Sequence, residues 1–231
     1  MMLHIPQVLS QGALSEARAL LKEANWVDGG VSAGTQASQV KRNEQLHLDS
    51  PALLRIQALV LEAVEQHALL FSAALPKRIF PPMVNRYSGA LNSYGDHVDS
   101  AIRHLRDGQG QAQRLRTDLS ATLFLAEPDD YDGGELVIAA SLGEQRVKLA
   151  AGDVVLYPGS TVHRVEPVTR GARLAAFFWI ESMVRQDAQR QILFDLDMGL
   201  MALRERHGDS PETVRLAGAY HNLLRQWAHT Y

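Results

Sequence analysis

The feature that most constrains the fold of this chain is a run of short strand-like segments between residues 79 and 182. About seven or eight of them alternate with turns that contain Gly, Pro or Asp. Residues 117–125 alternate between two faces, as expected for a half-buried strand. Many short strands between tight turns are typical of antiparallel sandwiches and barrels, so the sequence predicts a jelly-roll core. The clearest turns are Asp132-Gly133-Gly134, Ala151-Gly152-Asp153 and Pro158-Gly159-Ser160.

Helices are predicted on both sides of this core, which makes the chain mainly β with flanking helices. Residues 1–78 are expected to form an N-terminal helical region with loops, packed on the core at 79–182. Its strongest start signal is Ser50-Pro51, because serine caps a helix and proline suits the first helical position. Residues 183–231 are expected to form a C-terminal helical extension. The polar stretch 30–45 is expected to be a loop or a short edge strand.

Composition restricts the class of protein and its partners. Hydrophobic residues make up 46% and charged residues 21% of the 231 residues, which is ordinary for a globular protein. A net charge of −3 favours neither a nucleic-acid partner nor an acidic membrane surface. The absence of cysteine excludes disulfides, zinc–thiolate sites and iron–sulfur clusters. The densest basic cluster is expected to be a solvated loop; it comprises Arg103, Arg106, Arg114 and Arg116.

The N-terminal sequence predicts a cytoplasmic protein. It has no basic segment followed by an apolar one, as a signal peptide would have. No run approaches the about 20 apolar residues that are needed to span a bilayer. We therefore expect no membrane partner.

Two histidines and one aspartate carry the strongest chemical signal. His97 and Asp99 are separated by one residue, which places both side chains on one face of an extended strand. His163 follows the turn at residues 158–160 in a later predicted strand. Two imidazoles and a carboxylate form a facial triad that is typical of non-haem Fe(II) oxygenases. We predict these three residues as metal ligands and catalytic centre, and the other histidines as structural or surface residues.

Arg173 lies ten residues after His163, at the start of a strongly apolar strand. A buried arginine requires an anion, and its planar fork suits a carboxylate-bearing co-substrate beside the metal. The alternative is an ordinary ion pair with Glu166 or Glu181. Tyr87 is a second candidate donor to the same anion, or else a packed core residue. Trp179 is expected in the core or the pocket wall, and further pocket candidates are Tyr94, Tyr157, Ser120 and Thr122.

These residues resemble a known family. His97-x-Asp99, His163 and Arg173 resemble the motif of Fe(II)/2-oxoglutarate-dependent dioxygenases of the prolyl 4-hydroxylase-like group. More narrowly, the whole chain resembles the bacterial PKHD-type hydroxylases. The segments that carry this resemblance are Trp26-Val27-Asp28-Gly29-Gly30, Lys41-Arg42-Asn43, Asn85-Arg86-Tyr87, Tyr94-Gly95-Asp96-His97-Val98-Asp99, Tyr131-Asp132-Gly133-Gly134-Glu135-Leu136 and Tyr157-Pro158-Gly159-Ser160-Thr161-Val162-His163.

The resemblance implies a double-stranded β-helix with iron at His97, Asp99 and His163 and with 2-oxoglutarate held by Arg173. It also implies hydroxylation of a substrate with release of succinate and CO2, ascorbate as an accessory reductant, and a link to iron uptake. The carboxylate of Asp99 favours hydroxylation, because a small residue there would let a halide reach the metal. The substrate is expected to be a small molecule or a peptidyl group.

Two other classes of function stay open. The segment from Gly152-Asp153 through Pro158-Gly159 to His163 also resembles half of a cupin motif, which predicts a metal-dependent enzyme that is not an oxygenase. That interpretation requires a histidine at position 99 and gives Arg173 no role. The third class is a sensor that binds 2-oxoglutarate or iron.

The C-terminal helices are expected to cover the barrel or to form a homodimer interface. Their apolar face favours packing within the chain; it comprises Leu193, Leu196, Leu200 and Leu203.

Overall fold

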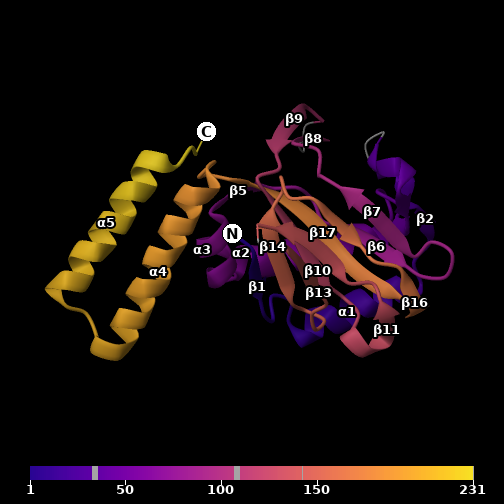
Figure 1. The fold of residues 1–231 in the computed structure, drawn as a ribbon, viewed down its shortest axis with the longest axis horizontal. Coiled ribbons are helices and arrows are strands. Elements are labelled where there is room, and N and C mark those ends of the chain that lie inside the picture. Colours follow the sequence, from indigo (N-terminus) through magenta and orange to yellow (C-terminus); the bar gives the residue numbers. More distant parts are fainter. Residues whose placement is uncertain (33–35, 107–109, 142, 231) are drawn as a thin grey trace.

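The computed structural model describes residues 1–32, 36–106, 110–141 and 143–230, and every structural statement below concerns these residues. Antiparallel strands form two large sheets that face each other (Figure 1). The strands of the first sheet are β1 (Leu3–Ile5), β2 (Trp26–Asp28), β4 (Glu44–Leu46), β5 (Pro76–Ile79), β6 (Met83–Tyr87), β10 (Leu119–Phe124), β14 (Val154–Pro158) and β17 (Arg173–Ser182). Those of the second are β3 (Lys41–Arg42), β7 (Ser93–His97), β12 (Leu136–Ala140), β13 (Gly143–Val147) and β15 (His163–Val165).

The strand order is that of a double-stranded β-helix. The eight-stranded sheet runs β1-β14-β10-β17-β6-β4-β2, with β5 also paired to β17. The five-stranded sheet runs β13-β12-β15-β7-β3. Strands distant in sequence are therefore neighbours, and the predicted jelly-roll core is confirmed. Two smaller pairs lie at the ends, one formed by β8 (Ile102–Arg106) and β9 (Ala112–Arg116), the other by β11 (Tyr131–Gly133) and β16 (Val168–Gly171).

Helices cover the outer face of the larger sheet. These helices are α1 (Gln11–Lys22), α2 (Pro51–Gln66) and α3 (Ala68–Ala74). The chain also contains three 3-10 turns among the described residues, η1 (Gly29–Ser32), η2 (Ala37–Gln39) and η3 (Pro128–Asp130). Buried side chains of α1 to α3 pack with Ala121, Ala176 and Phe178 in one apolar cluster. Ser10 and Ser50 accept hydrogen bonds from the backbone N–H groups of Ala13 and Leu53, as expected of cap residues.

The inner face of the larger sheet carries the polar pocket. Alternation along β17 sends Arg173, Phe177 and Trp179 to this face. The register pairs Arg173 with Tyr87 on β6 and Trp179 with Ser120 on β10. One strand therefore supplies side chains to the whole length of the pocket.

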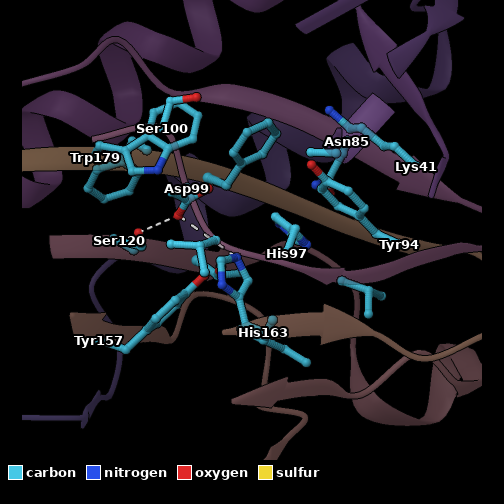
Figure 2. Close-up of a pocket in the computed structure, with 18 of the residues that line it drawn as sticks. Lys41, Asn85, Tyr94, His97, Asp99, Ser100, Ser120, Tyr157, His163 and Trp179 are labelled. Atoms are coloured by element: carbon cyan, nitrogen blue, oxygen red, sulfur yellow. Dashed lines mark hydrogen bonds and ion pairs between the residues drawn. The ribbon is translucent and has the colours of Figure 1, made fainter. Parts of the chain in front are cut away.

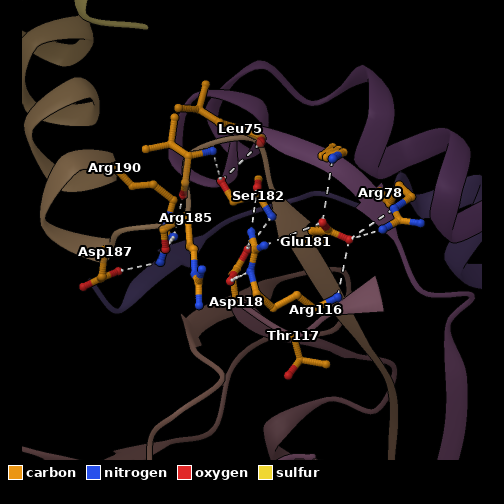
Figure 3. Close-up of polar contacts among 12 residues, drawn as sticks. Leu75, Arg78, Arg116, Thr117, Asp118, Glu181, Ser182, Arg185, Asp187 and Arg190 are labelled. Carbon is orange, nitrogen blue, oxygen red and sulfur yellow. Dashed lines mark hydrogen bonds and ion pairs between the residues drawn. The ribbon is translucent and has the colours of Figure 1, made fainter. Parts of the chain in front are cut away.

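An ionic network lies at the end of β17 (Figure 3). The buried carboxylate of Glu181 accepts a hydrogen bond of 2.5 Å from Arg78 on β5, and the guanidinium of Arg116 on β9 lies 3.8 Å away. Arg116 also makes two hydrogen bonds to Asp118, which accepts one from the backbone N–H of Ser182. These contacts join three strands at the point where the chain leaves the sheet.

The C-terminal helices α4 (Asp187–His207) and α5 (Pro211–Trp227) form an antiparallel pair beside the sandwich (Figure 1). Leu193, Leu200 and Tyr220 pack with Leu75 in a separate apolar cluster, so α4 is attached through α3. No residue of the pair lines the pocket, but Phe194 of α4 belongs to the apolar cluster of the larger sheet, so the pair packs within the chain as the sequence predicts. Leu203 of the predicted apolar face is 39% exposed. The homodimer stays a prediction.

Two sequence expectations differ from the structure. Residues 1–78 supply strands to both sheets as well as helices, because β1 and β4 complete hydrogen bonds along β14 and β6. Such pairing depends on distant partners and leaves little local signal. The basic cluster is a β-hairpin, β8 paired with β9, instead of a solvated loop. Among the described residues, no helix is both long and apolar enough to cross a membrane.

Candidate active site

Three side chains converge at one end of the space between the sheets (Figure 2). One ligand atom each from His97, Asp99 and His163 lies within 4.8 Å of the others. His97 ends β7, His163 begins β15, and the two residues are direct partners in the sheet register. The imidazole Nε2 of His163 lies 3.8 Å from Oδ2 of Asp99. The structure therefore brings together the three residues that the sequence predicts as metal ligands.

Backbone carbonyls orient both imidazoles. Nδ1 of His97 donates to the carbonyl of Gly95 over 2.8 Å, and Nδ1 of His163 donates to that of Thr161 over 3.0 Å. An imidazole that donates from Nδ1 keeps the lone pair on Nε2 when it is neutral. Both rings are thus held in the tautomer that a metal ion requires.

The local electrostatics favour a neutral His97, and a hydrogen bond orients Asp99. Burial and the neighbouring His163 lower the pKa of His97 to about 4, so its ring is uncharged at neutral pH. Ser120 Oγ donates a 2.6 Å hydrogen bond to Asp99 Oδ2, which fixes the carboxylate. The stacked ring of Tyr94, with a centroid distance of 3.6 Å, restricts His97 from the other side.

Asp99 differs from the expectation in one respect. The strand ends at His97, and Asp99 lies in the irregular segment before β8. The two side chains therefore do not share the face of one strand. The hydrogen bond from Ser120 on the opposite sheet, and not strand alternation alone, fixes the orientation of the Asp99 carboxylate.

Arg173 lies at the inner end of the pocket and is only 1% exposed. Its guanidinium is packed between aromatic rings, with Cζ 5.4 Å from the centroid of Tyr87 and 5.3 Å from that of Phe124. Among the described residues, Arg173 forms no ion pair, and its Nε has no hydrogen-bond partner. Glu181 and Glu166 are bound by other arginines, so the ion pairs considered as an alternative are absent from the described structure. A buried cation of this kind fits an anionic ligand.

Tyr87 is buried beside Arg173, and burial raises its pKa to about 12. It therefore stays a protonated phenol that can donate a hydrogen bond. Its hydroxyl lies 3.5 Å from the amide nitrogen of Asn85. Tyr87 and Arg173 therefore lie next to each other in the lining of the pocket.

The remaining pocket candidates lie where the sequence predicts them. Trp179 forms part of the pocket wall. Burial raises the pKa values of Tyr94 and Tyr157, which keeps both phenols neutral. The four further candidates that line it are Tyr94, Tyr157, Ser120 and Thr122.

Sequence reasoning missed two cationic residues of the pocket, Lys41 and Arg103. Lys41 belongs to the short strand β3 beside Tyr94, and burial together with Arg103 lowers its pKa to about 8. Arg103 stacks on Trp179, with Cζ 3.8 Å from the ring centroid. The sequence placed Arg103 in a basic cluster that was expected to be a solvated loop, so no local signal indicated its place in the pocket.

Comparison with known proteins agrees with this geometry. Residues 82–181 match the family model of the 2OG-Fe(II) oxygenase superfamily, and residues 187–229 match the PKHD-type hydroxylase C-terminal domain. A prolyl hydroxylase from Trichoplax adhaerens, solved with a peptide fragment of a hypoxia-inducible factor, has a similar fold. Its TM-score is 0.54 at 15% identity, over 83% of this chain and 86% of that one. The fold and the matched model define the class as Fe(II)- and 2-oxoglutarate-dependent oxygenases.

The family is narrower than this class. PKHD-type hydroxylases from Verminephrobacter eiseniae and from a Polaromonas species are each 59% identical to this chain over 230 residues, with complete coverage of both sequences. The chain therefore belongs to the PKHD-type hydroxylase family, and it is an enzyme of the dioxygenase class. This membership favours the oxygenase over the cupin and sensor interpretations.

Proposed function

We propose that the enzyme hydroxylates an organic substrate while 2-oxoglutarate is converted to succinate and CO2. His97, Asp99 and His163 would hold Fe(II), and Arg173 would hold the distal carboxylate of 2-oxoglutarate with help from Tyr87. The observation that carries this proposal is the combination of the three-ligand cluster with a fully buried arginine in one pocket. When bound, the metal and co-substrate supply the oxidative chemistry.

The donor set supports ferrous iron. Two neutral imidazoles and one carboxylate suit Fe(II), and three protein ligands leave positions open for co-substrate and oxygen. Both imidazoles direct Nε2 away from their carbonyl partners, so no rearrangement of the rings is needed. The carboxylate of Asp99 leaves no room for a halide in its place, which supports hydroxylation.

The chain's own residues would position the co-substrate and exclude water. Arg173 can present two N–H groups to a carboxylate, and in a buried site such charge-assisted bonds are strong. The aromatic rings of Tyr87 and Phe124 hold the guanidinium in place. The part of the pocket beside Trp179 would then receive the substrate.

The proposal has several finer parts that rest on the family resemblance alone. They are a small-molecule or peptidyl substrate, ascorbate as the reductant that maintains Fe(II), and a contribution to iron uptake. The role of ascorbate is tested by measuring whether its addition prolongs the consumption of 2-oxoglutarate by the enzyme. The link to iron uptake is tested by whether deletion of the gene impairs growth under iron limitation.

The central test is an anaerobic titration of the metal-free protein with Fe(II) and 2-oxoglutarate. The chelate gives a weak visible charge-transfer band, and we expect it only when both components are present. In Arg173→Ala the dissociation constant for 2-oxoglutarate should rise by about 100-fold, because a buried charged pair is broken. Arg170→Ala is the matched control, since Arg170 is exposed and pairs with Asp132 outside the pocket. A normal band in Arg173→Ala would overturn the assignment of Arg173.

A further inference from the structure

The three candidate metal ligands are not held by the chain in the same way. His97 and His163 come from paired strands, where the sheet register fixes their backbones. Asp99 lies instead in the irregular segment 98–101 between β7 and β8. The residues on both sides of Asp99 are exposed, so apolar packing contributes little to the position of this segment. The backbone of Asp99 therefore depends on contacts with another part of the chain.

Thr117, which lies between β9 and β10, makes two hydrogen bonds to this segment. Its Oγ1 donates to the carbonyl of Ser100 over 2.8 Å, and its backbone N–H donates to the carbonyl of Ala101 over 3.0 Å. Thr117 is only 7% exposed, although both of its partners are exposed residues. A buried residue thus holds the two residues that follow Asp99.

The same residue contacts the turn that precedes His163. The backbone of Gly159 approaches Thr117 so closely that a Cβ atom on Gly159 would collide with the Thr117 carbonyl oxygen. The next carbonyl in the chain, that of Asp118, accepts a hydrogen bond of 3.0 Å from the N–H of Gly159. Thr117 therefore lies between the two segments that carry Asp99 and His163.

The ionic network at the end of β17 fixes the backbone on both sides of Thr117 (Figure 3). Arg116 makes hydrogen bonds of 2.6 and 2.8 Å to Asp118, which accepts a third, of 2.9 Å, from the backbone N–H of Ser182. Threonine is also β-branched, so its side chain has few accessible rotamers. Thr117 is thus a rigid hydrogen-bond donor, as a residue that positions a neighbouring segment has to be.

We propose that Thr117 is a positioning residue of the metal site, which sets the distance between Asp99 and His163 by docking the Asp99 segment against the turn before His163. It acts on the backbone of the ligand, whereas Ser120 acts on the carboxylate. This inference rests on the proposed function, because it concerns the same three ligands. Metal affinity depends on residues behind the ligands, because they hold the ligands in place before the ion binds.

Thr117→Val tests this role, because valine has nearly the same shape as threonine and lacks the hydroxyl group. Co(II) serves as the probe, because it accepts imidazole and carboxylate ligands and its visible absorption reports their geometry. We expect the affinity for Co(II), measured by chelator competition, to fall by about tenfold, and the absorption band to change. Thr117→Ser should restore most of the affinity and the band, because serine keeps the hydroxyl group.

Thr213→Val is the matched control. Thr213 is 4% exposed in the first turn of α5, and its Oγ1 donates to the carbonyl of Ser210 over 2.9 Å. The same substitution there removes a hydroxyl-to-carbonyl hydrogen bond outside the pocket. It should lower stability but leave the affinity for Co(II) and the absorption band unchanged. Normal affinity in Thr117→Val, or an equal loss in both variants, would overturn the proposal.

A measurement on the metal-free protein separates this inference from the proposed function. The backbone N–H of residue 117 donates to Ala101, so its hydrogen–deuterium exchange reports whether the Asp99 segment is docked. We expect about fivefold faster exchange in Thr117→Val, because the loss of one net hydrogen bond changes an opening equilibrium by about this factor. Exchange should stay normal in Thr117→Ser and in Thr213→Val. If the unmodified protein binds Co(II) and exchange in Thr117→Val is unchanged, this inference alone fails. If the unmodified protein binds no metal, the proposed function fails as well.

Discussion

At the scale of single residues, hydrogen bonds orient each of the three candidate metal ligands. The imidazoles are oriented by two backbone carbonyls, which no side-chain substitution removes. The carboxylate of Asp99 depends instead on a side chain, Ser120, which reaches it from the opposite sheet. This makes Ser120 a residue through which the metal site can be weakened without changing a ligand.

Ser120→Ala should lower the affinity for Fe(II) by about tenfold or more, because partners of metal ligands typically contribute that much. The measurement is competition with a chelator of known affinity, under anaerobic conditions. Ser160→Ala serves as the control, since Ser160 is exposed in the neighbouring turn. Equal affinities for Ser120→Ala and the unmodified protein would show that Asp99 needs no such support.

The charge of Lys41 gives a prediction about pH. Burial and Arg103 lower its pKa to about 8, while Asp99 and Asp28 oppose this shift, and the ring of Tyr94 packs against it. The ammonium form therefore persists below pH 8 and is lost as the pH rises above it. Iodide is an anionic and acrylamide a neutral quencher of tryptophan fluorescence, so the ratio of their quenching constants should be constant between pH 6 and 7 and should decrease by pH 9 as the Lys41 charge is lost. Lys41→Arg should abolish this decrease; a decrease of the same size would assign it to another group.

At the scale of elements, the connection from β14 to β15 determines where His163 begins its strand. The turn brings Gly159 against the preceding segment, and its N–H donates to the carbonyl of Asp118 over 3.0 Å. A Cβ atom at this position would collide with the carbonyl oxygen of Thr117. The glycine in the sequence is thus required by a close backbone approach four residues before a metal-ligand candidate.

Gly159→Ala should lower the free energy of unfolding by about 1–3 kcal/mol, because the extra methyl group forces the backbone apart. Urea unfolding measures this change, and chelator competition should show weaker metal binding. Gly199→Ala is a control for which we expect the opposite effect, an increase in stability. Nothing lies near its Cβ position in α4, and alanine stabilises a helix by about 1 kcal/mol relative to glycine. A neutral effect of Gly159→Ala would mean that the turn can adjust.

At the scale of the whole molecule, the chain has two structural parts with different tasks. The two sheets, the segment from Val98 to Arg103 and the turn η2 supply the residues that line the pocket, whereas α4 and α5 supply none and pack mainly through a separate apolar cluster. The ionic network around Glu181 lies near the junction between the sheet and these helices (Figure 3). Substitutions in the helix pair should therefore change the free energy of unfolding, whereas substitutions in the pocket should change the binding of metal and co-substrate.

Leu193→Ala tests this separation. Leu193 is fully buried in the cluster, so its truncation should destabilise the protein by about 2–5 kcal/mol. The charge-transfer band with Fe(II) and 2-oxoglutarate should be unchanged at temperatures where the variant is folded. Ile192→Ala, at a site 47% exposed, should change stability by less than about 0.5 kcal/mol. Loss of the band in folded Leu193→Ala would show that the helices support the pocket.

Local sequence features predicted a large part of this molecule. Turn residues and alternation indicated the β core, and Ser50-Pro51 marked the start of α2, where Ser50 accepts from the N–H of Leu53. The candidate ligands were recognisable because metal chemistry permits few residue types at few spacings. Turns, alternation and helix caps depend on neighbouring residues, and ligand candidates depend on residue type, so all of them can be recognised in a single sequence.

Only the tertiary structure decided which distant segments meet. It placed β1, β2 and β4 in the larger sheet, although the sequence around them predicted helices, loops or a short edge strand. It also brought Lys41 beside Tyr94 and Arg103 onto Trp179, and it positioned Asp99 through Ser120. The sequence by itself determined the class of chemistry, because ligand types are local. The pocket's charge and shape depend on the register between strands that are far apart in the chain, and that register exists only in the folded protein.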